Sequence, residues 1–108
     1  MDIFPVEYNG TSGLGEPAYK GLTIRYYYNE YAFSIFIVGS TSDTISNGSL
    51  ITTLPFSVPF PMQAGNIWST VNEFLLTPQS DGTTKVYANI EFSSGYAVRC
   101  TIGGAVYK

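Results

Sequence analysis

The chain has 108 residues, a formal net charge of −3 and no histidine, a size that suits one domain. Charged residues make up 12% of the chain, against about 25% in ordinary soluble domains. The five Lys and Arg residues are scattered along the sequence, so they predict no cation cluster for nucleic acid or for an anionic membrane surface. Ser, Thr, Asn and Tyr replace the missing charges, which is typical of a β-rich surface.

Glycine and proline interrupt the first 21 residues, where only residues 3–8 have the pattern of a short strand. We expect residues 1–20 to form an arm or connector and residues 21–108 to form one head domain. The opening residues lack a basic region and a long apolar run, so they predict no secretory signal. No apolar stretch is long enough to predict a membrane span, and we expect synthesis in the cytosol.

Two runs of period-two alternation follow, over residues 22–28 and 31–38, with Asn29-Glu30 as a tight turn between them. Tyr27 falls on the outward face of the first run. The second run is apolar on both faces, which predicts a central strand or one covered on its second side by a partner.

Four more extended runs are expected, over residues 50–54, 66–76, 85–92 and 96–102. Prolines at 55, 59 and 61 exclude regular ladder pairing after the first run, and Asp81-Gly82 predicts a turn. Gly103-Gly104 predicts a bulge or bend before a last extension over residues 105–107. With no helical period anywhere, the pattern predicts an all-β, antiparallel β-sandwich of seven or eight short strands and no significant helix.

The absence of histidine removes the usual general base and the commonest metal ligand. Glu73 and Glu91, both expected on strands, could act as a glycosidase pair only across a cleft, about 5–9 Å apart. Solvated carboxylates on strand faces are the simpler interpretation. Cys100 occupies an alternating apolar position, which predicts a buried structural thiol. We therefore predict a binding protein with no catalytic residue, metal or cofactor.

The aromatic residues suggest what is bound. Sugars stack on aromatic rings, while amides and hydroxyls bond their polar groups. Tyr27 and Tyr87 are expected on outward faces, Asn89 shares the face of Tyr87, and Trp68 lies among polar residues. These four are the candidate ligand-binding residues. The alternative for any tyrosine is packing in the core or at a subunit interface, because tyrosine favours strands.

Four stretches of the sequence occur in a recognisable order. They are the paired runs 21–26 and 33–39, the Ser/Thr-rich loop that ends in the short strand Leu50-Ile51-Thr52-Thr53-Leu54-Pro55 with Pro59 and Pro61 beyond it, the run 86–92 after the Asp-Gly turn, and the closing run 95–101 with Tyr107. Together they resemble the C-terminal domains of phage tail-fibre, baseplate and head-fibre proteins. Only about 20 residues precede the domain, in place of the long N-terminal shaft of that family, so we expect either a fragment or a small stand-alone virion protein.

The resemblance implies a homotrimer with jelly-roll-like β-sandwich heads, which bind bacterial surface polysaccharide for host attachment or decorate the particle. Leu54, Pro55 and Cys100 would be structural, and residues 1–20 could dock on another virion protein. It implies a virion location after synthesis in the host cytoplasm. Two alternatives stay open. One is a small intracellular phage protein that binds or sequesters a small molecule without catalysis, although cations to grip phosphate are scarce. The other is a carbohydrate-binding module from a larger enzyme.

Overall fold

The computed structural model describes residues 13–15, 18–68 and 70–105. These residues form nine β-strands and no helix, which confirms the predicted all-β class. The strands are β1 Gly13–Gly15, β2 Ala18–Tyr19, β3 Leu22–Tyr28, β4 Ala32–Ser40, β5 Leu50–Leu54, β6 Met62–Ala64, β7 Phe74–Pro78, β8 Thr84–Ala88 and β9 Ala97–Ala105.

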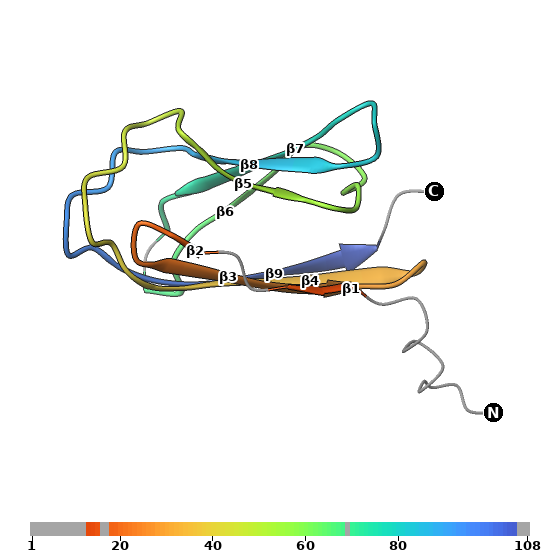
Figure 1. Ribbon diagram of the computed structural model, residues 1–108, viewed down its shortest axis with the longest axis horizontal. Coiled ribbons are helices and arrows are strands. Elements are labelled where there is room, and N and C mark those ends of the chain that lie inside the picture. Colours follow the sequence, from red (N-terminus) through yellow and green to blue (C-terminus); the bar gives the residue numbers. More distant parts are fainter. Residues whose placement is uncertain (1–12, 16–17, 69, 106–108) are drawn as a thin grey trace.

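Two antiparallel sheets pack face to face (Figure 1). Sheet I has the order β1-β3-β4-β9, with β2 also paired to β3, and sheet II has the order β5-β8-β7-β6. The core between the sheets is apolar, because alternate residues of each long strand point inward. The β-sandwich is therefore present, and its jelly-roll type stays a prediction.

The predicted hairpin between residues 22–28 and 31–38 is confirmed as β3 and β4. Asn29 closes its turn, because its Oδ1 accepts hydrogen bonds from the backbone N–H groups of Tyr31 (2.8 Å) and Ala32 (3.0 Å). An Asn side chain that bonds the backbone two and three residues on is a typical turn device. β4 pairs with β3 on one side and with β9 on the other, so it is central, as its two apolar faces predicted.

The proline-containing segment 55–61 connects opposite edges of sheet II, from β5 to β6. The buried side chain of Thr84 holds this segment in place through two hydrogen bonds. The Thr84 Oγ1 donates to the carbonyl of Phe56 at 2.7 Å and accepts from the N–H of Val58 at 3.0 Å. The Phe56 ring then lies 4.7 Å from the Tyr28 ring and 5.4 Å from the Phe33 ring, measured between centroids. One threonine thus satisfies backbone groups that a proline-rich segment cannot pair in a ladder.

Three sequence-based expectations need correction. Residues 66–68 and 70–73 belong to a loop rather than a strand, and the predicted run is a strand only where it overlaps β7. β9 passes through Gly103 and Gly104 in regular register with Ser34 and Phe33, without a bulge. The glycine at 104 serves packing, since a Cβ there would lie 3.3 Å from the Phe33 ring.

The sandwich also begins earlier than residue 21, because β1 and β2 both pair with β3. The expected arm therefore contributes an edge to sheet I over its described residues. The predicted strand at residues 3–8 and most of the final extension at 105–107 lie outside the described residues.

Two glycines with the same backbone φ of 91° test how much the β2–β3 turn depends on close packing. A Cβ on Gly21 would lie 2.2 Å from the carbonyl oxygen of Ser40, whereas a Cβ on Gly48 would meet nothing within 4 Å. Both Gly→Ala changes incur the left-handed backbone cost of about 1–2 kcal/mol. We expect Gly21→Ala to lose about 2 kcal/mol more than Gly48→Ala in urea unfolding, because backbone must shift. Equal losses would contradict the packing seen at this turn.

Candidate ligand-binding site

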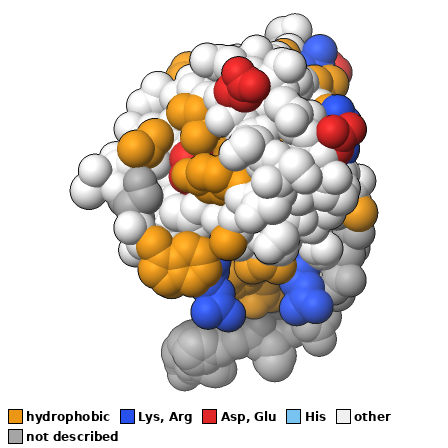
Figure 2. Space-filling view, turned by 90° about the vertical axis from the view of Figure 1, so that its left-hand side faces the viewer, with side chains coloured by type: hydrophobic (Ala, Val, Ile, Leu, Met, Phe, Trp, Pro, Cys, Tyr) orange, Lys and Arg blue, Asp and Glu red, His pale blue; other side chains and the backbone are white. Residues whose placement is uncertain are grey.

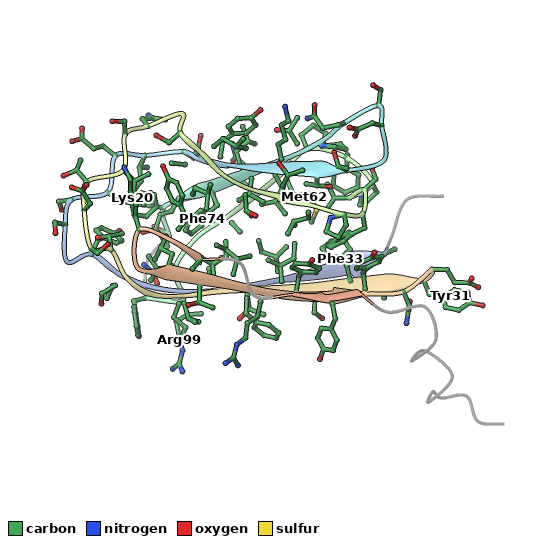
Figure 3. The ribbon with its side chains drawn as sticks, in the orientation of Figure 1. Lys20, Tyr31, Phe33, Met62, Phe74 and Arg99 are labelled. Carbon is green, nitrogen blue, oxygen red and sulfur yellow. The ribbon has the colours of Figure 1, made fainter. Side chains whose placement is uncertain are left out.

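The outer face of sheet I carries three rows of side chains, set by the strand register. The rows, each running from β3 over β4 to β9, are Thr23–Val38–Arg99, Arg25–Phe36–Thr101 and Tyr27–Ser34–Gly103. Their neighbours along each strand point into the core, so these residues form the opposite face. Figure 3 shows the labelled Arg99 directed away from sheet II.

An open groove of about 610 Å³ lies over these rows. Phe36 and Val38 of the central strand form its apolar floor, and Tyr27, Thr101 and the two arginines also line it. In the third row, the half-exposed Tyr27 is followed by the small residues Ser34 and Gly103. The site is thus built mainly from strands, which hold its floor rigid.

The loop between β6 and β7, described over residues 65–68 and 70–73, supplies one wall of the groove, at Ile67. Asn66 and Ile67 bond to the free edge of β9 as a strand would. Asn66 Oδ1 accepts from the N–H of Arg99 (2.6 Å), its Nδ2 donates to the carbonyl of Ala97 (2.9 Å), and the N–H of Ile67 donates to the carbonyl of Arg99 (3.0 Å). The loop therefore covers an edge that would otherwise expose unpaired backbone groups.

The carboxylate of Glu73 holds this loop in place. Glu73 is fully buried and accepts hydrogen bonds from the backbone N–H of Asn66 (2.9 Å), from its Nδ2 (3.4 Å) and from the hydroxyl of Tyr96. The hydrogen bond to Glu73, helped by burial, raises the pKa of Tyr96 above its usual value. A buried carboxylate is tolerated when donors surround it in this way.

The base of the same loop is closed by backbone contact and by two side-chain amides. A Cβ on Gly65 would lie 1.8 Å from the carbonyl oxygen of Val71, so only glycine fits there. Asn89 Nδ2 donates to the carbonyl of Asn72 (2.9 Å), and Asn72 Nδ2 donates to Oε1 of Gln63 (3.1 Å). Asn89, predicted as a ligand-binding residue, thus supports the loop.

The four predicted site residues do not form one site. Tyr27 lines the groove, and Trp68 follows the groove residue Ile67 in the loop, with 64% of its surface exposed. Tyr87 lies on the outer face of sheet II, between Leu50 and Leu75 in the register. Sequence reasoning placed Tyr27 and Tyr87 outward, but alternation does not tell which sheet a strand joins.

Several groove residues were not predicted as site residues, although the signal was present. Arg25, Phe36 and Arg99 occupy the outward positions of alternating runs, beside Tyr27, Val38 and Thr101. Ile67 carries no such signal, because the composition of its segment predicts a strand. Two arginines on the same sheet face as an apolar floor become visible only once β3, β4 and β9 are paired.

The remaining predicted residues lie as follows. Leu54 and Cys100 are buried, whereas Pro55 is exposed. Burial, with the charge of Glu73, raises the pKa of the Cys100 thiol to about 11. Glu73 is buried and Glu91 is exposed, and neither belongs to a strand, so the expectation of solvated strand carboxylates is wrong for Glu73.

Within the described parts of the chain, no group of three or more His, Cys, Asp or Glu side chains could hold a metal ion. The same residues include no helix long and apolar enough to span a membrane. Comparison with protein-family models, with curated proteins and with solved structures finds no match.

The Tyr96–Glu73 hydrogen bond yields a prediction with a pH signature. Because one partner is charged, we expect Tyr96→Phe to cost about 1.5–3 kcal/mol of unfolding free energy at pH 7. The raised pKa of Tyr96 means that its contribution is complete below about pH 10 and is lost as pH rises through the folded-state pKa. The difference in unfolding free energy between wild type and Tyr96→Phe, measured by urea titration, should therefore become smaller above pH 10.

Tyr87→Phe is the matched control, because the Tyr87 hydroxyl has no hydrogen bond to the described residues. We expect it to change stability by less than about 0.5 kcal/mol. If Tyr96→Phe lost as little unfolding free energy as Tyr87→Phe, the hydrogen bonds of Glu73 would not be what holds the loop in place.

Proposed function

We propose that the chain is a phage virion structural protein whose β-sandwich binds a bacterial surface glycan without catalysis, through the groove on sheet I. The phage and virion parts of this proposal rest on the sequence resemblance described above. The binding part rests on one observation, the groove that joins the apolar floor of Phe36 and Val38 to the exposed ring of Tyr27 and to polar side chains.

The chemistry of the groove suits a sugar. The apolar C–H face of a sugar ring can stack on Tyr27 and on the floor, while Thr101 and the guanidinium groups can bond its hydroxyls. Trp68 adds an exposed aromatic ring beside Ile67. The floor comes from paired strands, so little ordering is needed on binding, and this favours affinity.

Assembly as a trimer is part of the proposal. Three heads would present three equivalent grooves to a repetitive polymer, and linked sites raise weak binding by about 10²–10⁴-fold. We further propose that residues 1–20, part of which pairs with β3 as β1 and β2, join the head to another virion protein.

A second candidate function is sequestration of a small anionic molecule inside the infected cell. One observation favours it: both arginines of the chain line the same groove, which offsets the scarcity of cations elsewhere. Such a protein needs neither a trimer nor a cell-surface ligand.

Light scattering after size exclusion separates the two candidates. The virion proposal expects a trimer that persists on dilution to the nanomolar range, because the assembled particle requires one. A stable monomer, with a nucleotide or similar anion bound, would contradict the virion proposal and favour sequestration.

Binding to a glycan array or to host cells tests the groove itself. We expect Tyr27→Ala to weaken binding about tenfold, equivalent to one lost stacking contact of about 1.4 kcal/mol, and Trp68→Ala to weaken it as well. Tyr87→Ala is the control. Because Tyr87 lies on sheet II, this variant should bind the glycan as tightly as wild type does. If all three variants bound equally well, the groove would not be the glycan site.

A further inference from the structure

We infer that the glycan taken by the groove is acidic, with carboxylate or phosphate groups spaced along it to meet Arg25 and Arg99. This inference rests on the proposed function and adds the chemical class of the ligand. Its starting point is that the chain has only two arginines, and both line the groove.

The two arginines stand at diagonal corners of the apolar floor. Arg25 is on β3 in the row of Phe36, and Arg99 is on β9 in the next row, that of Val38. They are two strands and two residues apart, so their Cα atoms are separated by about 12 Å from standard strand spacings. A ring stacked on the floor between them would place acidic substituents within reach of both guanidinium groups.

The charge around the groove is opposite to that of the whole chain. The net charge is −3, yet none of the described carboxylates, at Glu30, Asp43, Glu73, Asp81 and Glu91, lines the groove. Lys20 and Lys85 lie outside it as well. Figure 2 shows basic groups on either side of apolar atoms near the lower end of this view. The described side chains that line the groove are therefore basic or uncharged, on an acidic protein.

The chemistry of arginine indicates the chemical class of the ligand more closely. Arginine presents a planar fork that pairs with carboxylate or phosphate through two parallel hydrogen bonds. Beside an apolar floor, a ligand that covers a guanidinium group removes water from it, and an anion best compensates that loss. A neutral sugar offers neither guanidinium group an opposite charge.

A nucleic acid is also a polyanion, but it fits less well. Its affinity depends on neutralising many closely spaced phosphates, and the groove offers two cations with an apolar floor between them. A polysaccharide, whose charges are separated by sugar rings, matches that spacing better.

The test uses the full chain and immobilised polymers as probes. Polygalacturonate, alginate and hyaluronan are compared with the same polymers after their carboxyls are reduced to alcohols. Poly(glycerol phosphate) and single-stranded DNA complete the panel. We expect at least one acidic polysaccharide to bind at least tenfold more tightly than its carboxyl-reduced form, or poly(glycerol phosphate) to bind at least tenfold more tightly than dextran. Which polymer binds distinguishes carboxylate from phosphate.

Charge-matched variants assign the effect to the groove. Arg99→Gln and Arg25→Gln should each weaken binding of the acidic polymer about tenfold, the loss of one charge-assisted contact. Lys85→Gln removes the same charge from the outer face of sheet II and should stay within twofold of wild type. Thermal melts of all three variants confirm that each remains folded.

The outcomes separate this inference from the proposed function. If neutral and acidic polymers bind equally and Tyr27→Ala weakens both, the groove binds glycan but the inferred acidity is wrong. If neither a polysaccharide nor poly(glycerol phosphate) binds, both proposals fail. If DNA binds as tightly as the best polysaccharide, or if the Arg→Gln variants bind as wild type does, the acidic-glycan inference is overturned.

Discussion

The buried carboxylate of Glu73 determines how the groove is built. Burying a charge is costly unless donors surround it, and here the donors come from Asn66 in the loop and from Tyr96 beside β9. In the position where Asn66 bonds to Glu73, the loop also bonds to the edge of β9. Ile67 becomes a wall of the groove as a result. The hydrogen bonds of Glu73 therefore shape the groove, although Glu73 itself is buried and does not line it.

β4 connects stability to the candidate site. Its inward residues, among them Phe33, Ile35 and Ile37, are in the core, while Phe36 and Val38 form the floor of the groove. Both faces of the strand are apolar because both are covered, one by sheet II and the other, in our proposal, by a ligand. A partly exposed apolar floor is a common feature of binding sites. The two flanking arginines give the floor a preference for charge that apolar contact alone cannot provide.

Much of the fold could be predicted from alternation and turn chemistry. The inward and outward faces of β3, β4 and β9 follow from period two, and Asn29 and Asp81-Gly82 predicted their turns. The loop between β6 and β7 could not be predicted, because Ile67, Trp68 and Val71 lead into the apolar run of β7 and have the composition of a strand. Its actual form depends on Glu73, which bonds to Asn66 seven residues before it and to Tyr96 23 residues after it, and no local pattern reports this pairing. The candidate site was half predicted for a similar reason: Tyr27 and Tyr87 are both outward, but strand pairing places them on opposite sides of the molecule.

The most direct test of the groove is a map of backbone amide chemical shifts while an acidic oligosaccharide, such as oligogalacturonate, is added to the isotope-labelled protein. If the groove is the binding surface, the largest shifts occur at Arg25, Phe36, Ile67 and Arg99, and Arg99→Gln requires about tenfold more oligosaccharide to produce them. Shifts centred on Leu75 and Tyr87, on the outer face of sheet II, would contradict the account.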